Sequence, residues 1–383
     1  MINLSLNKKI IIFGFIFTFF SSFGQSFFLG LFNAPIRNEL DITHGQFGSI
    51  YAVATIFSSL LFIWVGKKID DFRLLNYSFF VIILLFFSTL FFSFINSIYF
   101  LAVGIFLMRF SGQGLMGHTS TTAISRYFDK SRGRALSIIW FGMSTAEFIF
   151  PVLVIYFLTI YSWRSVWQGI SIIVILILPL IINFTIKKIN FESREDDLEE
   201  KLKTKIKSWK RTEVLKDFRF YIISSNMLAM PWIFTGMAVY QSFISDSKLW
   251  DTYTIPKAFM VYSIASIITL FSSGFLVDKF TSRKLIPIMN IPLLLAMVVL
   301  FYSKQEISAY FFLGLIGISN GFGNILGSST WAEIYGVKYI GSIKALTTAF
   351  MVFSTALGTA VFGILIDNGF TIENIAFICG SYI

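Results

Sequence analysis

Residues 75–96 read LNYSFFVIILLFFSTLFFSFIN, an apolar run without a single charged side chain. As an α-helix this run would rise about 33 Å, and the hydrocarbon core of a bilayer is about 30 Å thick. A helix satisfies its own backbone hydrogen bonds, which a segment surrounded by lipid must do. The run therefore predicts a transmembrane helix.

Ten further apolar runs have a similar length, so we predict an all-α membrane protein with about twelve transmembrane helices. The first run begins directly after the basic start of the chain, and it is too long and lacks the cleavage site of a signal peptide. A twelfth run begins near Thr371, and the sequence stops at Ile383, so the last helix is expected to be short or truncated. The ten runs are 10–34, 46–66, 98–118, 135–160, 166–186, 219–243, 256–277, 285–302, 308–328 and 346–366.

The composition supports a membrane protein. Of 383 residues, 56% are hydrophobic and 14% are charged, and 47 are Phe. A soluble domain carries about a quarter charged residues, so one water-soluble core is not expected to bury this many apolar side chains. The net charge of +10 lies in short loops, where it is typical of membrane topology and lipid headgroup contact, not of nucleic-acid binding.

The loop charges predict the orientation. If the N-terminus is cytoplasmic, the opposite side carries only five basic residues, which are Arg37, Arg164, Lys248, Lys257 and Lys304. The cytoplasmic side then carries most of the Lys and Arg in both halves of the chain. The positive-inside rule therefore predicts a multi-pass protein of the cell (inner) membrane with both termini in the cytoplasm.

The longest polar stretch, Lys187–Lys216, divides the helices six and six. We therefore expect a first bundle at 1–186, a cytoplasmic linker at 187–218 and a second bundle at 219–383. Apolar residues recur within the linker at helical spacing, at Leu198, Leu202, Ile206 and Trp209. An amphipathic helix on the leaflet surface and a solvated linker both fit this pattern.

The two halves also share short motifs. Gly24-Gln25-Ser26-Phe27 is similar to Tyr240-Gln241-Ser242-Phe243, and Gly66-x-x-x-Asp70 is similar to Gly274-x-x-x-Asp278. The offsets are 216 and 208 residues. Duplicated halves are common in secondary transporters.

At these residues the chain resembles the major facilitator superfamily, and the resemblance covers its whole length. That family has two six-helix halves and a Gly-x-x-x-Asp-[basic]-x-Gly-[basic]-[basic] motif that braces the cytoplasmic face. The second copy has Thr281 at the second glycine position and otherwise fits at Gly274, Asp278, Lys279, Arg283 and Lys284. The first copy, at Gly66 and Asp70, departs: Asp71 replaces the base, and Arg73 replaces the glycine. A gating role is therefore expected mainly of the second copy.

Helix 4 carries a further element of the resemblance. Arg109-Phe-Ser-Gly-Gln113-Gly114 is similar to the family's Arg-x-x-Gln-Gly, with one residue inserted. The following loop, Arg126 to Ala135, and Trp163-Arg164 look most like bacterial carriers of monocarboxylates and of oxalate and formate. The resemblance implies a carrier that works by alternating access, and we expect a monomer.

Motifs of enzymes are absent from the sequence or misplaced. Gly112-x-Gly114-x-x-Gly117 matches a dinucleotide-binding pattern, but it lies inside a membrane helix, where glycines favour close helix packing. The sequence has no phosphate-binding loop and no hydrolase or zinc-protease motif. His44 and His118 lie far apart without a cysteine cluster. We therefore expect no enzyme activity, no cofactor and no metal.

Two ionisable residues lie deep in apolar runs, Arg109 in helix 4 and Glu147 in helix 5. Placing a charged side chain in the middle of a membrane helix costs at least ~2.5–3.5 kcal/mol of insertion free energy, so such residues usually have a function. Arg109 lies about 16 Å and Glu147 about 20 Å from the outer face. They could form a structural pair. Alternatively, Arg109 meets a substrate anion, with Glu147 as a modulator or proton acceptor.

Several amides are further candidates for substrate contact. Gln25 and Gln241 are the better ones, because helices 1 and 7 line the cavity in the resembling family, and Asn320 and Asn324 follow in helix 10.

We expect a transporter for a small organic anion, such as a monocarboxylate, coupled to a proton or another ion. The alternatives are an exporter of amphipathic compounds and a membrane sensor that binds a ligand without moving it. Phe150 precedes Pro151, where drug/proton antiporters of the family carry a Gly-Pro pair, which argues against that subgroup.

Overall fold

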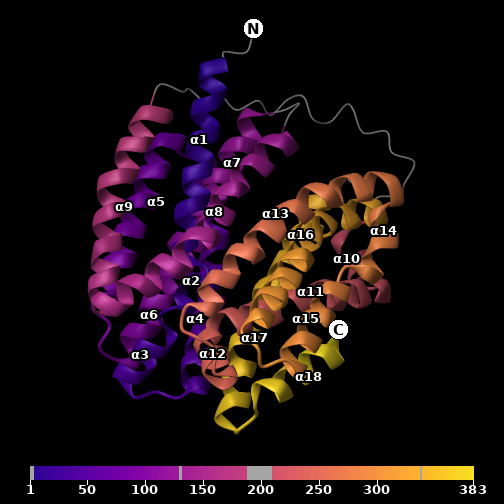
Figure 1. Cartoon of the computed structure of the whole chain (residues 1–383). Helices are drawn as coiled ribbons and strands as arrows, with labels where there is room; N and C mark the ends of the chain where they lie inside the picture. The colour runs from indigo at the N-terminus through magenta and orange to yellow at the C-terminus, as the bar shows by residue number, and fades with distance from the viewer. Residues whose placement is uncertain (1–3, 129–131, 188–208, 337–338) are drawn as a thin grey trace. The chain divides into compact units, whose positions relative to one another are not determined.

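The structure is a computed structural model that describes residues 4–128, 132–187, 209–336 and 339–383. Within these residues every regular element is a helix, and the long helices of each unit run side by side (Figure 1). The chain separates into two compact units, Met1–Arg194 and Glu195–Ile383. The division lies within the expected linker, and Leu198, Leu202 and Ile206 lie outside the described residues. The domain limits at 186 and 219 remain predictions.

The first unit contains six membrane helices, of which two are interrupted. The first membrane helix consists of three helical segments and the fourth of three, and a 3-10 turn follows the second. In chain order the elements are α1 (Leu4–Ser21), η1 (Ser22–Gly24), α2 (Ser26–Gly30), α3 (Asn33–Leu40), α4 (His44–Lys67), η2 (Lys68–Asp70), α5 (Leu74–Phe92), α6 (Ile98–Met108), η3 (Arg109–Met116), α7 (Gly117–Tyr127), α8 (Arg132–Ile160) and α9 (Trp163–Thr185).

The second unit has the same order of long helices. It begins with a short helix at the end of the linker, and its first membrane helix is also interrupted. In chain order the elements are α10 (Arg211–Val214), α11 (Phe218–Val239), α12 (Gln241–Lys248), α13 (Thr254–Phe280), α14 (Ser282–Leu285), η4 (Ile286–Ile288), α15 (Ile291–Tyr302), α16 (Ile307–Tyr335), α17 (Ile340–Asp367) and α18 (Ile372–Tyr382).

Among the described residues, eleven helical spans are long and apolar enough to cross a membrane, and α18 follows as the twelfth helix. The predicted all-α membrane fold is confirmed. Most predicted boundaries agree with the structure to within a few residues. Helices 4 and 10 are longer than predicted, at Ile98–Tyr127 and Ile307–Tyr335, because their last turns are polar and hydropathy alone ends the helix too early.

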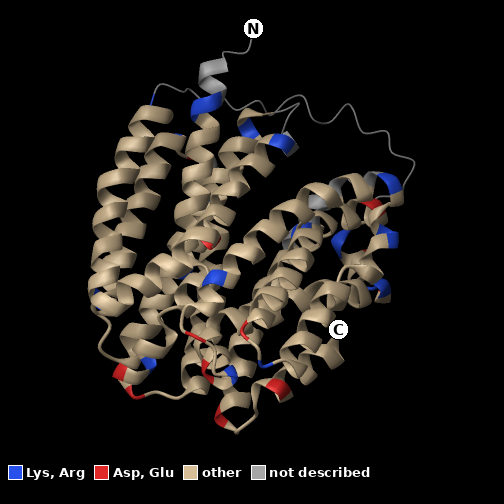
Figure 2. Cartoon of the chain, in the orientation of Figure 1, with Lys and Arg blue, Asp and Glu red and all other residues tan. Residues whose placement is uncertain are grey.

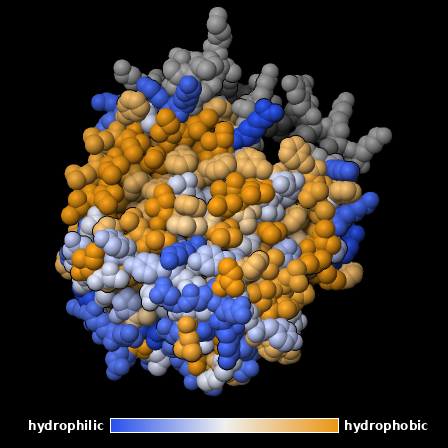
Figure 3. Space-filling model, in the orientation of Figure 1, coloured by the Kyte–Doolittle hydropathy of each residue, from blue (hydrophilic) through white to orange (hydrophobic). Residues whose placement is uncertain are grey.

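Charge and hydropathy are distributed as a bilayer requires. Charged residues in each unit lie mainly at the helix ends, and the middle of the helices carries few of them (Figure 2). Hydrophobic residues cover much of the visible helix surface (Figure 3). On α9, Leu180 and Phe184 expose 70% and 68% of their surface. Such exposure is favourable only where the surrounding solvent is lipid.

The duplication predicted from the motifs is visible in the backbone, at the 208-residue offset of the Gly66 and Gly274 motifs. α3 and α12 are both eight residues long and are shifted by 208 residues. Each ends at a non-glycine residue with positive φ, Asp41 at 51° and Leu249 at 57°. This register pairs Gln241 with Asn33, so the expected pairing of Gln241 with Gln25 is wrong. A four-residue similarity is too short to distinguish two registers that differ by eight residues.

The repeat includes an ion pair in each unit, at the ends of α3 and α12. In the first unit, Glu39 at the end of α3 accepts from Arg164 of α9 at 2.5 Å and from Trp163 Nε1 at 2.7 Å. In the second unit, Lys248 at the end of α12 donates to Glu373 of α18 at 2.8 Å. Each pair joins the short helix that follows the first membrane helix of its unit to the sixth membrane helix.

Candidate functional site

The first membrane helix is broken near its C-terminal end, five residues before Gly30. Gln25 is extended, with φ −83° and ψ 153°, and separates η1 from α2. The amide of Phe28, which would donate to Gly24 in a continuous helix, donates to the Gln25 carbonyl instead. The carbonyl of Gly24 therefore needs another donor, as at the end of any helix.

The fourth membrane helix is irregular at the contact with this break. Residues Arg109–Met116 form a π-helix, which holds one more residue per turn than an α-helix. A Cβ on Gly24 would lie 2.3 Å from the Met108 carbonyl oxygen and 2.4 Å from the Gln113 amide. Only glycine fits at this position, because the two backbones touch. The residue inserted in the Arg-x-x-Gln-Gly motif is a sequence signal for this wide turn.

Arg109 provides the missing donor. It is 3% exposed, and its Nη1 donates to Gly24 O at 3.2 Å and to Ser26 Oγ at 3.3 Å. Its guanidinium lies 5.3 Å from the centre of the Tyr51 ring, and the Tyr51 hydroxyl donates to Ser26 Oγ at 3.0 Å. Arg109, Ser26 and Tyr51 therefore form one buried network. Sequence reasoning missed Tyr51, which carries no distinctive local motif.

Glu147 lies on α8 and is 7% exposed. Among the described residues the structure contains no ion pair between Glu147 and Arg109, and no hydrogen bond to the Glu147 carboxyl group. Their similar depth in the membrane does not bring them together as a pair. Each is a buried ionisable group without a partner of opposite charge in the described part of the chain.

The predicted amides are divided between the two units, with Gln25 in the first and Gln241, Asn320 and Asn324 in the second. Gln25 is half-buried at the break in helix 1. Gln241 is buried at the start of α12, where its Nε2 donates to Ala238 O at 3.0 Å. Asn320 binds α16 to α13 through Ser266 Oγ at 2.9 Å, and Asn324 is exposed on α16. Of these four, only Gln25 belongs to the segment that contacts Arg109.

The first copy of the gating motif lies at the end of α4. Gly66 O contacts His118 Nε2 at 3.1 Å, and Arg126 Nη1 donates to Ile69 O at 3.2 Å. Asp71, at the position of the expected base, pairs with Lys68 at 3.0 Å. Arg73 is exposed where the motif has glycine. The side chain of Asp70 lies outside what the structure describes.

The second copy connects α13 to α14. Ser282 donates to the Glu333 carboxylate through its amide at 3.1 Å, and Arg283 donates to the Glu333 carbonyl. Thr281, at the second glycine position of the motif, has φ 68° and ψ 151°. A positive φ is strained for a β-branched residue, which gives the physical reason for glycine at this position of the motif. Lys279 is exposed, and the side chains at Gly274 and Asp278 are outside the described set.

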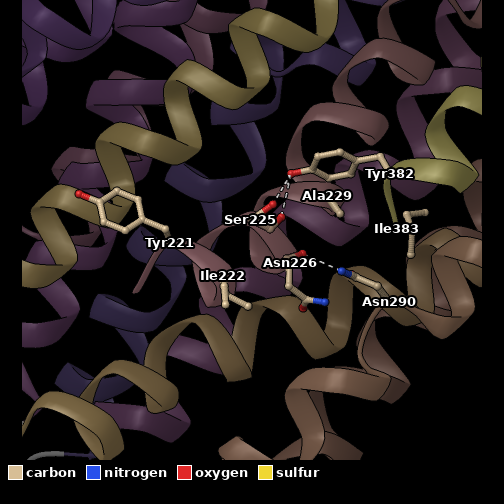
Figure 4. A pocket seen from close by; sticks show the side chains of 8 residues that line it. All are labelled: Tyr221, Ile222, Ser225, Asn226, Ala229, Asn290, Tyr382 and Ile383. Atoms are coloured by element: carbon tan, nitrogen blue, oxygen red, sulfur yellow. Dashed lines mark hydrogen bonds between the residues drawn. The ribbon is translucent and has the colours of Figure 1, made fainter. Parts of the chain in front are cut away.

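A pocket of about 450 Å³ lies in the second unit and is lined by residues of α11, α18 and the start of α15. The Tyr382 hydroxyl donates to Ser225 O at 2.9 Å, and Asn290 Nδ2 donates to Asn226 O at 2.6 Å (Figure 4). None of the lining residues has a charged side chain, and none is a predicted site residue. The pocket therefore offers no cation to an anionic ligand.

Comparison with known proteins identifies the fold. The model of the Major Facilitator Superfamily matches residues 14–359. The nucleoside transporter NupG is 14% identical, with a TM-score of 0.73 over 99% of this chain and 96% of NupG. A bacterial homolog of the human lysosomal transporter Spinster, inward-facing and unoccupied, is 15% identical, with a TM-score of 0.71 over 99% of this chain and 92% of the homolog. A search of curated proteins found no sequence match.

Proposed function

The chain belongs to the major facilitator superfamily, and we propose that this secondary transporter carries a small organic anion, such as a monocarboxylate, by alternating access. It is a transporter and not an enzyme, and it binds a small-molecule substrate. Secondary transporters of this kind bind substrate near the bilayer midplane, often at interrupted helices. The break at Gln25 and the wide turn at Arg109 meet within the first and fourth membrane spans of the first unit.

The proposal that the substrate is an anion rests on one observation. Arg109 is buried in the membrane, and in the described residues it contacts a carbonyl and a hydroxyl but no carboxylate. A buried charge without a partner of opposite charge is costly. A substrate anion would supply that charge each time it binds. A nucleoside, which the name of one structural neighbour mentions, carries no such charge.

Glu147 supports coupling to a proton. A buried carboxylate without a cationic partner is unfavourable, and protonation removes its charge. We propose that Glu147 binds a proton during transport and that Arg109 binds the anion. A proton and a monocarboxylate would then cross the membrane together without moving net charge.

We also propose that the transporter works as a monomer in the cell (inner) membrane with both termini in the cytoplasm. The support for this orientation is the excess of Lys and Arg in alternate loops. The charged helix ends in each unit agree with loops that lie in water (Figure 2).

The test is a thermal-shift screen of the purified protein against a library of organic acids, followed by uptake into liposomes. We expect one or more organic anions to stabilise the protein in a concentration-dependent manner. Arg109→Gln should remove that stabilisation while the protein still elutes as a folded monomer. Stabilisation only by neutral or cationic compounds would contradict the proposal.

A further inference from the structure

The contacts of Arg109 leave one edge of its guanidinium available. Nη1 is engaged by Gly24 O and Ser26 Oγ. Nε is buried without a hydrogen-bond partner, and both hydrogen bonds that the structure gives the guanidinium come from Nη1. Nε and Nη2 point to the same side of the planar group. Two parallel donors on one edge match the two oxygens of a carboxylate.

Ser26 is poised to donate a third hydrogen bond. Its Oγ accepts from Tyr51 at 3.0 Å and from Arg109 at 3.3 Å. A hydroxyl group has two acceptor positions and one proton, so both acceptor positions of Ser26 are occupied. The proton of Ser26 has no acceptor among the described residues, and it remains available to an anion at Arg109.

Tyr51 holds the other two residues in place. It is fully buried, its hydroxyl donates to Ser26, and its ring faces the Arg109 guanidinium. Because Tyr51 donates to Ser26, the Ser26 proton must point elsewhere. The ring and the hydroxyl therefore fix both the direction of the guanidinium and the direction of the Ser26 proton.

We infer that Ser26 and Tyr51 complete a carboxylate site with Arg109, in which the Nε and Nη2 edge of Arg109 binds both carboxylate oxygens and Ser26 donates to one of them. Tyr51 is a positioning residue in this site. The inference rests on the proposed function and narrows it to monocarboxylates. In the described part of the chain, no second Lys or Arg bonds to this network, so one guanidinium balances one negative charge.

The experiment compares planar and tetrahedral anions on matched variants. The probes are acetate, propionate and benzoate and the corresponding methane-, ethane- and benzenesulfonates. Dissociation constants are measured by thermal shift on the purified full chain. The variants are Ser26→Ala and Tyr51→Phe. The controls are Ser88→Ala, which loses a buried serine–serine hydrogen bond, and Tyr77→Phe, which loses a bond to Val65 O.

Wild-type protein is expected to bind a carboxylate more tightly than the matched sulfonate. Ser26→Ala should weaken carboxylate binding by about tenfold or more, because a hydrogen bond to a charged group is lost. Tyr51→Phe should weaken it by a smaller factor, since the ring remains. The controls should stay within about twofold of the wild-type anion affinity, because neither Ser88 nor Tyr77 bonds to Arg109, Ser26 or Tyr51.

The outcomes separate the inference from the proposed function. If no organic anion binds the wild-type protein, the proposed function fails. If organic anions bind and require Arg109, but Ser26→Ala binds like the controls or sulfonates bind as tightly as carboxylates, only the inference fails. If Ser26→Ala does not fold, Ser26→Thr and Ser26→Val are compared instead. Thr and Val have nearly the same shape, and Thr has a hydroxyl group where Val has a methyl group. Thr is expected to retain binding and Val to lose it.

Discussion

Lys248 and Glu373 form an ion pair in which the Lys248 side chain is fully buried, and the equivalent pair in the first unit, Glu39 and Arg164, has the charges exchanged. In both units the pair joins the short helix after the first membrane helix to the first turn of the sixth membrane helix. The two pairs differ in exposure. Glu39 exposes 48% of its side chain, whereas Lys248 exposes none.

This difference predicts unequal effects on stability. Glu373→Gln leaves the Lys248 ammonium buried without a partner and should lower the unfolding free energy by about 3 kcal/mol. Glu39→Gln removes an exposed carboxylate and should cost under about 1 kcal/mol. The measurement is thermal unfolding of the purified variants in detergent. The double variant Lys248→Met with Glu373→Met should recover most of the loss, and a double variant as unstable as Glu373→Gln would contradict this account.

The relationship between Arg109 and Glu147 gives a second prediction. Because Arg109 bonds to Gly24 and Ser26 and not to Glu147, the two residues should act independently. Arg109→Gln should abolish anion binding, and Glu147→Gln should retain binding but remove the dependence of uptake on a pH gradient. The double variant should remain inactive. Uptake is normalised to folded protein from the size-exclusion profile, and a double variant that transports at near wild-type rate would refute the role of Arg109.

The strained backbone at Thr281 gives a third prediction. With φ 68°, this β-branched residue stores strain of roughly 1–3 kcal/mol. Thr281→Gly should therefore stabilise the protein by about 1 kcal/mol, after the greater freedom of glycine in the unfolded chain is subtracted. Thr348→Gly, at an exposed position inside α17, is the control and should destabilise. Equal effects of both changes on the melting temperature would show that Thr281 is not strained.

The predicted orientation is tested with single cysteines in a background where Cys379, which is buried, has been replaced. Ser247 and Thr212 are both exposed. A cysteine at Ser247 should react with an impermeant thiol reagent in intact cells, because the positive-inside rule places it outside. A cysteine at Thr212 should react only after permeabilisation. The reverse pattern would invert the topology of the whole chain.

The long apolar runs predicted the membrane helices well, because a helix in lipid must be apolar over its whole length. The breaks within those helices were not predicted. Gln25 interrupts a run that stays apolar on both sides of the break, whereas the chain becomes more polar after Tyr240. The residue inserted in the helix 4 motif lies within the π-helix, but no irregular turn was predicted from it.

The network around Arg109 was only partly predictable. Arg109 is conspicuous because a charge in an apolar run is rare, and Ser26 lies beside Gln25 in a motif shared by both halves. Tyr51 lies on α4, 25 residues from Ser26 and 58 from Arg109, and contacts both only through tertiary packing. Periodicity describes one helix at a time and does not reveal contacts between three helices.

The two ion pairs, Glu39 with Arg164 and Lys248 with Glu373, have their charges exchanged, and this exchange also affects how the chain assembles. Because α3 and α12 have the same length and the same kind of ending, we expect that either could meet the sixth helix of the wrong half during membrane insertion. Such an exchange would place Lys248 against Arg164 and Glu39 against Glu373, two like-charged contacts in place of two attractive ones. Opposite polarity in the two copies therefore directs each first helix to its own partner, a sorting problem that gene duplication creates and that two identical ion pairs would leave unsolved.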